Sequence, residues 1–260
     1  MKNSQDKPQK NSIKKGDLFQ LGEHTLLCGD STKKSDVETL LKGKTVRLLL
    51  TDPPYGVAYV EGRMEKSKQE HKVIQNDHLQ SEEDYSNFSS HWLEAIKPYL
   101  EAKNSYYIFN SDRMLFSLRE GIKSQGFKMS QLLIWVKTGA VIGRLDYNPQ
   151  HELIAYGWLG THEALKGRDK TVLVAPKPLK NDLHPTMKPV SLLRRLVLNS
   201  TTRGDTVYDP FLGSGSTLIA CEQTKRRCIG IEIEPDYCKV IIDRFEKMTG
   251  SKAIKLAPHL

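Results

Sequence analysis

The sequence predicts an α/β protein whose mostly parallel sheet is covered by helices on both faces. Short apolar segments alternate with segments of helical character along most of the chain, which is the pattern of this class. Two apolar segments, Val46–Leu50 and Thr206–Tyr208, run into acidic turns, as strands do at the carboxyl edge of such a sheet. A length of 260 residues suits one large domain of this class or two small ones.

The first half of the chain is expected to alternate strands with helices. The strands are expected at His24–Cys28, Val46–Leu50 and Ser105–Phe109. The helices are expected at Ser35–Leu41, from Ser81 to about Lys97, and near Asp112–Ser124. Ser81 together with Asp84 is a typical N-cap pair, which sets the start of the second helix.

The second half is expected to begin with two strands that suit an antiparallel pair, Gln131–Val136 and His151–Trp158. Proline fits the first turn of a helix, so helices are expected to begin at Pro189 and Pro235 and to end near Asn199 and Met248. Between them come a strand at Thr206–Tyr208, a helix at Gly215–Gln223 and a strand at Cys228–Ile231.

The chain divides into a basic N-terminal tail, one domain and a short C-terminal tail. Residues 1–15 contain five lysines and one acid, a composition typical of disorder. The domain is expected to span residues 16–250, with polar, charged loops at 56–79 and 159–183. Residues 251–260 are expected to form the C-terminal tail.

The composition favours a soluble, cytoplasmic protein with a polyanionic partner. The net charge is +8, which points to nucleic acid. No apolar run approaches the length of a membrane span, and the N-terminus has no signal-peptide core. The four cysteines form no C-x-x-C pair, so reduced, mostly buried thiols are expected and a zinc site is not.

The first candidate site follows the apolar segment that ends at Leu50. Its residues are Asp52, Pro53, Pro54 and Tyr55. Proline has no N–H for a sheet ladder and its ring fixes φ, so two prolines end the strand and hold their carbonyls rigidly. An acid on one side and an aromatic ring on the other favour a binding site, with an ordinary surface turn as the alternative.

The second candidate site is the glycine-rich turn of residues 209–217, with the sequence D-P-F-L-G-S-G-S-T. Glycines let the backbone approach a ligand, and the following helix N-terminus offers free N–H groups. No Gly-Lys-Ser/Thr follows, which argues against a P-loop. Glu232 lies 23 residues after Asp209, at the end of the next strand, where an acid holds ribose hydroxyls in nucleotide-binding folds. An adenosine-containing ligand therefore fits, with a surface acid as the alternative.

Together these motifs resemble those of the amino-group DNA methyltransferases that use S-adenosylmethionine. Residues 52–55 resemble the catalytic motif and residues 209–217 the cofactor loop, in the chain order of the β class. Residues 184–189 (H-P-T-M-K-P) resemble the segment that closes over the cofactor, and Gly29-Asp30 the acid at its adenine. The resemblance spans about residues 16–250. It implies a Rossmann-like methyltransferase fold with a mostly parallel, seven-stranded sheet in which one strand is antiparallel.

The resemblance also implies the roles of individual residues. Asp52 and the Pro53 carbonyl would accept the two hydrogens of the target amine, while Tyr55 stacks on a base flipped out of the duplex. S-adenosylmethionine carries a sulfonium, already a strong electrophile, so no metal is needed. Lys188 would pair with the methionine carboxylate of this cofactor. The implied cofactor-binding residues are Asp30, His184, Thr186, Lys188, Asp209, Phe211, Gly213, Ser214, Gly215 and Glu232.

The partner implied by the resemblance is double-stranded DNA. Candidates for phosphate contacts are Arg63, Arg144, Lys166 and Arg168, with ordinary solvated surface as the alternative. Gly143-Arg144 and His151-Glu152 resemble the family's hairpin beside the target-base pocket. The loops at 56–79 and 159–183 are the candidate DNA-contacting segments. Residues 159–183 are few for reading several base pairs, so either the 56–79 loop or the second subunit of a two-fold homodimer is expected to complete DNA recognition.

The sequence leaves several alternatives open. Adenine N6 is the expected target because related cytosine-N4 enzymes more often have Ser in place of Asp52. RNA and a protein glutamine are further substrates, although the motif order argues against glutamine. A module that binds DNA and cofactor without catalysis is the alternative from another class. A lone modification enzyme and the methylating half of a restriction system fit equally, so a partner restriction endonuclease stays open.

Overall fold

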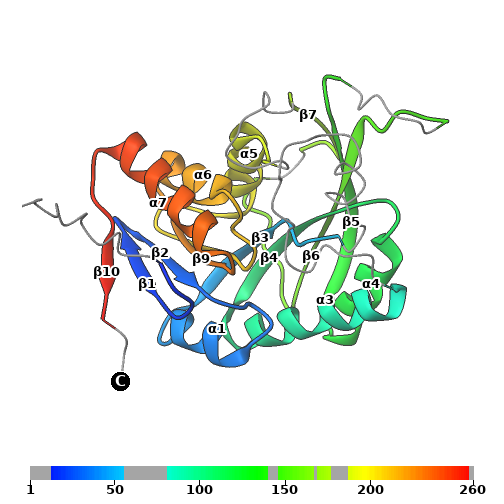
Figure 1. The fold of residues 1–260 in the computed structure, drawn as a ribbon. Helices are drawn as coiled ribbons and strands as arrows, with labels where there is room; N and C mark the ends of the chain where they lie inside the picture. Colours follow the sequence, from blue (N-terminus) through cyan, green and yellow to red (C-terminus); the bar gives the residue numbers. More distant parts are fainter. Residues whose placement is uncertain (1–12, 56–80, 140–145, 167–168, 177–186, 258–260) are drawn as a thin grey trace, which may run out of the picture.

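The computed structural model describes residues 13–55, 81–139, 146–166, 169–176 and 187–257, and the strands among them form one ten-stranded sheet (Figure 1). The order across the sheet is β10-β1-β2-β9-β8-β3-β4-β6-β5-β7. In chain order the strands are β1 (Leu18–Leu21), β2 (His24–Cys28), β3 (Val46–Thr51), β4 (Leu100–Asn110), β5 (Lys128–Val136), β6 (His151–Trp158), β7 (Val172–Val174), β8 (Thr206–Asp209), β9 (Arg227–Glu232) and β10 (Ile254–Leu256).

The α/β class with a mixed sheet agrees with the prediction, but the expected strand number of seven is wrong, because the described residues form ten. Strands β2, β9, β8, β3 and β4 are parallel neighbours. Strand β6 runs antiparallel to both β4 and β5, so the seven strands from β2 to β5 contain one antiparallel member. The additional strands β1, β7 and β10 lie toward the edges and have three or four residues each, too few for an alternating pattern to be read from sequence.

Helices cover both faces of the sheet and close two separate apolar cores (Figure 1). Helices α1, α3 and α4 pack on one face, with Trp92 among the largest buried side chains. Helices α5, α6 and α7 pack on the other face, where Phe245 is buried. The helices are α1 (Lys34–Leu41), α3 (Glu82–Ile96), α4 (Leu115–Ser124), α5 (Val190–Ser200), α6 (Ser216–Thr224) and α7 (Pro235–Thr249), with a 3-10 turn, η1 (Lys97–Tyr99).

Element boundaries follow local signals where these are strong. Ser81 is the N-cap of α3, and its side chain accepts a hydrogen bond from the Asp84 N–H, as expected. Pro235 is the first residue of α7, whereas Pro189 is the N-cap of α5. The segment expected as a C-terminal tail contributes β10, which pairs with β1. Residues 1–12 of the expected N-terminal tail lie outside the described residues.

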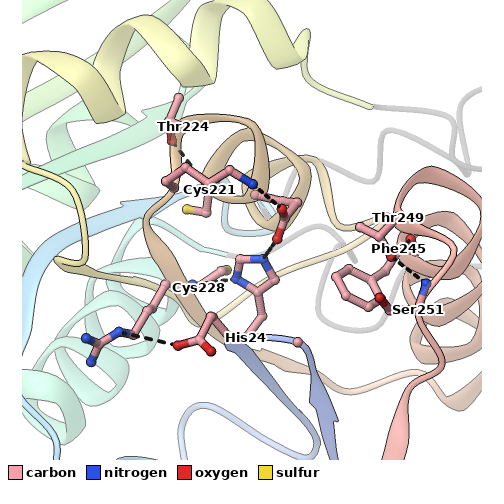
Figure 2. Close-up of polar contacts among 12 residues, drawn as sticks. His24, Cys221, Thr224, Cys228, Phe245, Thr249 and Ser251 are labelled. Atoms are coloured by element: carbon pink, nitrogen blue, oxygen red, sulfur yellow. Dashed lines mark hydrogen bonds and ion pairs between the residues drawn. The ribbon is translucent and has the colours of Figure 1, made fainter.

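A buried histidine joins β2, β9 and α6 at the edge where the parallel strands begin (Figure 2). The Nδ1 atom of His24 accepts a hydrogen bond from the Cys228 N–H at 2.9 Å, and its Nε2 lies 3.0 Å from Glu222 Oε2. Phe245 packs edge-on against the imidazole, with ring centroids 5.9 Å apart. Burial lowers the pKa of His24. These contacts give His24 a structural role far along its strand from the carboxyl edge.

The four cysteines are free and buried in the core beneath α5, α6 and α7. Their thiols lie in two hydrogen-bonded pairs, Cys28 with Cys238 and Cys221 with Cys228. The expectation of buried thiols is thus confirmed.

Within the described residues, no helix is both long and apolar enough to cross a membrane.

Candidate active site

The two candidate sites lie at the same edge of the sheet, at the ends of neighbouring strands. Strands β3 and β8 are parallel and paired, and they end at Thr51 and Asp209. The Thr51 hydroxyl donates a 2.7 Å hydrogen bond to Asp209 Oδ1, and both side chains are buried. Because Asp52 follows Thr51 directly, this bond fixes the Asp-Pro-Pro-Tyr turn beside the glycine-rich turn.

The Asp52 carboxylate is held from two sides. The Tyr55 hydroxyl donates to Oδ1 at 2.6 Å, and the Lys188 ammonium donates to Oδ2. Pro53 is buried, while Pro54 and Tyr55 are partly buried, so the turn packs against the protein. Two donors and two fixed φ angles together leave the carboxylate little freedom to reorient.

Glu152 and Lys137 extend the contacts of Asp52 into an ion-pair cluster. Lys188 Nζ lies 3.1 Å from Glu152 Oε2, and Lys137 Nζ lies 2.8 Å from Glu152 Oε1. The Tyr55 hydroxyl lies 3.3 Å from Glu152 Oε2. Glu152 is near the start of β6, and because β6 is antiparallel to β4, its first residues reach the carboxyl edge. We name Asp52, Tyr55, Lys137, Glu152 and Lys188 the edge cluster.

Burial and ion pairing oppose each other within the edge cluster. Burial raises the pKa of Asp52, although Lys188 acts in the opposite direction. Burial would also raise the pKa of Glu152, but Lys188 and Lys137 hold it below its ordinary value. Burial disfavours the Lys188 ammonium, yet its two carboxylate neighbours raise the pKa of Lys188. Asp52 is therefore the carboxylate of the cluster whose charge depends most on a single cation.

The glycine-rich turn is tied to the end of β9 by Glu232. The Gly213 N–H donates to Glu232 Oε2 at 2.7 Å and the Glu234 N–H donates to Oε1 at 2.9 Å. Gly213 and Gly215 have φ angles of 55° and 81°, in the left-handed region that favours glycine. Burial raises the pKa of Glu232 to about 7, against the two N–H donors. Glu232 and the glycine-rich turn, which the sequence predicts to form one site, are therefore in direct contact.

Asp209 lies under the same turn and accepts several hydrogen bonds. Besides Thr51, its donors are the Phe211 N–H at 3.1 Å and the Thr217 side chain. Burial nevertheless raises the pKa of Asp209 to about 6. The ring of Phe211 packs against α3, with its centroid 5.6 Å from those of Phe88 and Trp92. This packing anchors the turn to the helical layer opposite α6.

Two other residues predicted to bind the cofactor are held by neighbours at this edge. The Arg244 guanidinium donates to the carbonyl oxygen of Ser214 and to its hydroxyl, the latter at 3.1 Å. Asp30 follows the end of β2, and its Oδ1 accepts from the N–H and the hydroxyl of Thr32 at 3.0 and 2.7 Å. The Gly29 N–H donates to the backbone oxygen at the end of β9 at 3.0 Å, which places Asp30 at the carboxyl edge.

Some predicted residues cannot be placed in this geometry. His184, Thr186, Arg63, Arg144 and Arg168 lie outside the described residues. Lys166 is exposed, and its backbone N–H donates to the Asn199 carbonyl at 3.3 Å. The residues that the structure brings to the carboxyl edge are Asp30, Asp52, Pro53, Pro54, Tyr55, Lys188, Asp209, Phe211, Gly213, Ser214, Gly215 and Glu232.

Two residues of the edge cluster have no role predicted from the sequence. Glu152 is predicted only as part of a hairpin, and Lys137 is not singled out. An acid at the start of an antiparallel strand, beside parallel strands that end in acids, is the signal that points to Glu152. Nothing local in the sequence distinguishes Lys137 from other lysines.

A sequence profile of a family described as DNA methylase, of the N6/N4 methyltransferase type, matches residues 46–243, which is most of the chain and includes both turns. The chain belongs to the N6/N4 DNA methylase family. This confirms the resemblance inferred from the motifs. Within the described residues of this DNA methylase, no group of three or more side chains could hold a metal ion.

Individual relatives of this DNA methylase are similar over most of their length. The type II methyltransferase M2.DpnII of Streptococcus pneumoniae is 26% identical over 237 residues, covering 79% of this chain and 84% of the relative. The solved M1.HpyAVI–SAM complex has a TM-score of 0.61 at 22% identity, covering 84% of this chain and 98% of that one. The cytosine-N4-specific PvuII DNA methyltransferase has a TM-score of 0.67 at 16% identity, covering 87% and 90%. The α/β fold is thus one that solved DNA methyltransferases share.

Proposed function

We propose that this DNA methylase transfers the methyl group of S-adenosylmethionine to the N6 amine of a flipped-out adenine in a specific duplex DNA sequence. The observation that carries the proposal is the Thr51–Asp209 hydrogen bond, which fixes the Asp-Pro-Pro-Tyr turn beside the glycine-rich turn. A methyl donor held at one turn and an amine held at the other would then meet at a single edge of the sheet. Holding two reactants in line is itself a large part of catalysis.

The amine needs activation because its lone pair is delocalised into the ring. Asp52 Oδ1 and the Pro53 carbonyl would accept its two hydrogens, draw the nitrogen toward a pyramidal geometry and localise the lone pair. Fixed prolines would make these acceptors preorganised, so that little reorientation is needed in the transition state. Tyr55 would stack on the base after it leaves the duplex.

The cofactor would lie along the ends of β2, β9 and β8. Glu232 would accept the ribose hydroxyls, and Asp30 would contact the adenine. The turn residues Asp209, Phe211, Gly213, Ser214 and Gly215 would border the methionine part, together with His184 and Thr186 as the resemblance implies. S-adenosylmethionine supplies the transferred methyl group on a positively charged sulfur.

The partner would be double-stranded DNA, with Arg63, Arg144, Lys166 and Arg168 as candidate phosphate contacts. A homodimer and a partner restriction endonuclease belong to the same proposal. The type II relative M2.DpnII supports a role in a restriction-modification system. We also propose that the protein acts in the cytoplasm.

Cytosine N4 is the second candidate substrate, and one observation favours it. The cytosine-N4-specific PvuII enzyme shares this fold, with a TM-score of 0.67. The acid at position 52 favours adenine, because the related cytosine enzymes more often have serine there. Both reactions would use the same acceptors for the amine.

The experiment is methyl transfer from labelled S-adenosylmethionine to mixed-sequence duplex DNA, followed by mass spectrometry of the nucleosides. We expect N6-methyladenine, and we expect Asp52→Ala, which removes the acceptor, to lower the rate about 100-fold or more, the size of effect that loss of one preorganised hydrogen-bonding group has elsewhere. Asp243→Ala is the matched control, since Asp243 pairs with Lys239 on the exposed face of α7. Detection of N4-methylcytosine instead would support the same mechanism with cytosine as the target base. Absence of any methylated nucleoside, with cofactor bound, would refute the proposal.

A further inference from the structure

We propose that Lys188 is a positioning residue for Asp52: its ammonium keeps the carboxylate ionised and turns Oδ1 toward the target amine, and it does not bind the cofactor. The inference rests on the proposed methyl transfer to an amine. It departs from the role that the family resemblance implied for Lys188, which was an ion pair with the methionine carboxylate.

The donor count of Lys188 is the first argument. An ammonium has three N–H donors. Three acceptors surround Nζ, namely Asp52 Oδ2, Glu152 Oε2 at 3.1 Å and the Tyr55 oxygen at 3.4 Å. All three donors are therefore engaged by the edge cluster. A cofactor carboxylate could bind Lys188 only by displacing one of these partners.

The surroundings of Nζ are the second argument. The Lys188 residue is only 6% exposed. The Tyr55 ring centroid lies 5.6 Å from Nζ and the Phe109 ring centroid lies 5.3 Å from it, and such ring faces attract a cation. Phe109 belongs to β4, so the ammonium is enclosed by aromatic faces as well as by carboxylates. This enclosure favours a role for Lys188 as a fixed cation within the protein over a role in binding the cofactor.

The charge balance at Asp52 is the third argument. The charged groups that face it come from separate elements: Lys188 before α5, Glu152 of β6 and Asp209 of β8, with Lys137 after β5 pairing with Glu152. Glu152 and Asp209 are acids, and both disfavour a second negative charge nearby. Lys188 is the cation in direct contact with Asp52, so the ionised form of Asp52 depends on it. Its contact with Oδ2 leaves Oδ1 as the oxygen that faces Tyr55 and the proposed base position.

The test compares two variants for which opposite effects are expected. Lys188→Met removes the cation, and we expect the acidic limb of the kcat–pH profile to move up by about one to three pH units, since an opposite charge at this distance lowers a carboxyl pKa by that amount. Glu152→Gln removes a negative neighbour, so the limb should move down. The dissociation constant for S-adenosylmethionine, measured by calorimetry, should change less than threefold in Lys188→Met. Lys239→Met removes an exposed lysine that pairs with Asp243 and should shift neither quantity.

A second readout does not depend on activity. With ¹³C-labelled aspartate carboxyls, the Asp52 signal can be assigned by its loss in Asp52→Asn and then titrated by NMR. We expect the Asp52 titration midpoint to rise in Lys188→Met and to fall in Glu152→Gln. This readout stands even if the wild-type protein methylates no DNA, so failure of the proposed function and failure of the Lys188 assignment are distinguishable. If Lys188→Met does not fold, the same titration in Lys188→Gln, which also removes the charge but keeps a polar side chain, decides in its place.

Two results would overturn the inference. One is a Lys188→Met protein whose Kd for S-adenosylmethionine rises tenfold or more while its pH limb and Asp52 midpoint stay in place, because Lys188 would then be a cofactor ligand. The other is a Lys188→Met protein whose Asp52 midpoint does not rise, because Lys188 would then not keep the Asp52 carboxylate ionised.

Discussion

Replacing Thr51 by Val tests the hydrogen bond that joins the two turns. Thr51 and Asp209 are 2% and 3% exposed, so water cannot replace the lost hydroxyl. A hydrogen bond to a charged acceptor contributes about 1.5–3 kcal/mol, and one to a neutral acceptor about 0.5–1.5 kcal/mol. Because the pKa of Asp209 is about 6, the acceptor is charged at pH 8 and neutral at pH 5. We therefore expect Thr51→Val to lower the free energy of unfolding by about 2 kcal/mol at pH 8 and about 1 kcal/mol at pH 5.

The direction of this pH dependence follows from the linkage between protonation and folding. Burial raises the pKa of Asp209 above its ordinary value, so its contribution to stability is full at low pH and is lost as the pH rises through about 6. The Thr51 hydroxyl opposes this rise in pKa, and its removal moves the pKa further up. The variant must then lose more stability than the wild type as the pH increases.

Urea unfolding of both proteins at pH 5 and pH 8 measures this difference, with equal m-values as the condition for comparing midpoints. Thr224→Val is the matched control, because Thr224 is also buried but its hydroxyl bonds only to carbonyls of its own helix in the described structure. That variant should cost less than about 1 kcal/mol at either pH. A Thr51→Val effect that is independent of pH, or no larger than the control, would refute the role given to the Thr51–Asp209 bond.

Two further predictions concern the glycine-rich turn. In urea unfolding, Gly215→Ala should destabilise the protein by about 1–3 kcal/mol more than Gly250→Ala. Both glycines have a positive φ, but only at Gly215 would the added Cβ meet Ile241, at 3.1 Å. Equal effects of the two substitutions would count against tight packing at Gly215. Burial raises the pKa of Glu232 from 4.5 to about 7, so the stability that it contributes at low pH is lost as the pH rises through about 7. In the absence of cofactor, the free energy of unfolding of Glu232→Gln should therefore increase by about 2–3 kcal/mol relative to that of the wild type between pH 5 and pH 8. A difference between the two proteins that is the same at both pH values would contradict the cost of burying the Glu232 charge.

The positions of the two turns could be predicted from sequence because local chemistry fixes them. Prolines that cannot donate to a ladder end β3 after Thr51, and glycines with positive φ form the turn before α6. The start of α3 was equally local, since the Ser81 side chain caps it. Each of these features depends on residues only a few positions apart in the chain.

The remaining features depend on contacts between distant residues. Strands β7 and β10 have three residues each and exist because β5 and β1 offer free edges for pairing. The partner of Lys188 could not be read from its motif, since Asp52 lies 136 residues away in sequence. Glu152 reaches the edge cluster because β6 pairs antiparallel with β4 as well as with β5, and the sequence suggested only the pairing with β5. The sequence therefore predicts which residues form the two turns better than it predicts which residues hold them in place.

The acids at the carboxyl edge have different electrostatic surroundings, and this difference bears on which ligand each would take. Asp52 contacts the Lys188 ammonium, whereas the donors that the structure gives Asp209 and Glu232 are hydroxyls and backbone N–H groups. A carboxylate held by neutral donors is costly to bury, which explains the raised pKa values of Asp209 and Glu232. A positively charged ligand, such as the sulfonium cofactor proposed here, would offset that cost near β8 and β9. Near Asp52 the Lys188 ammonium already balances the carboxylate, so the burial cost there needs no cationic ligand and an uncharged amine can be the hydrogen-bond donor.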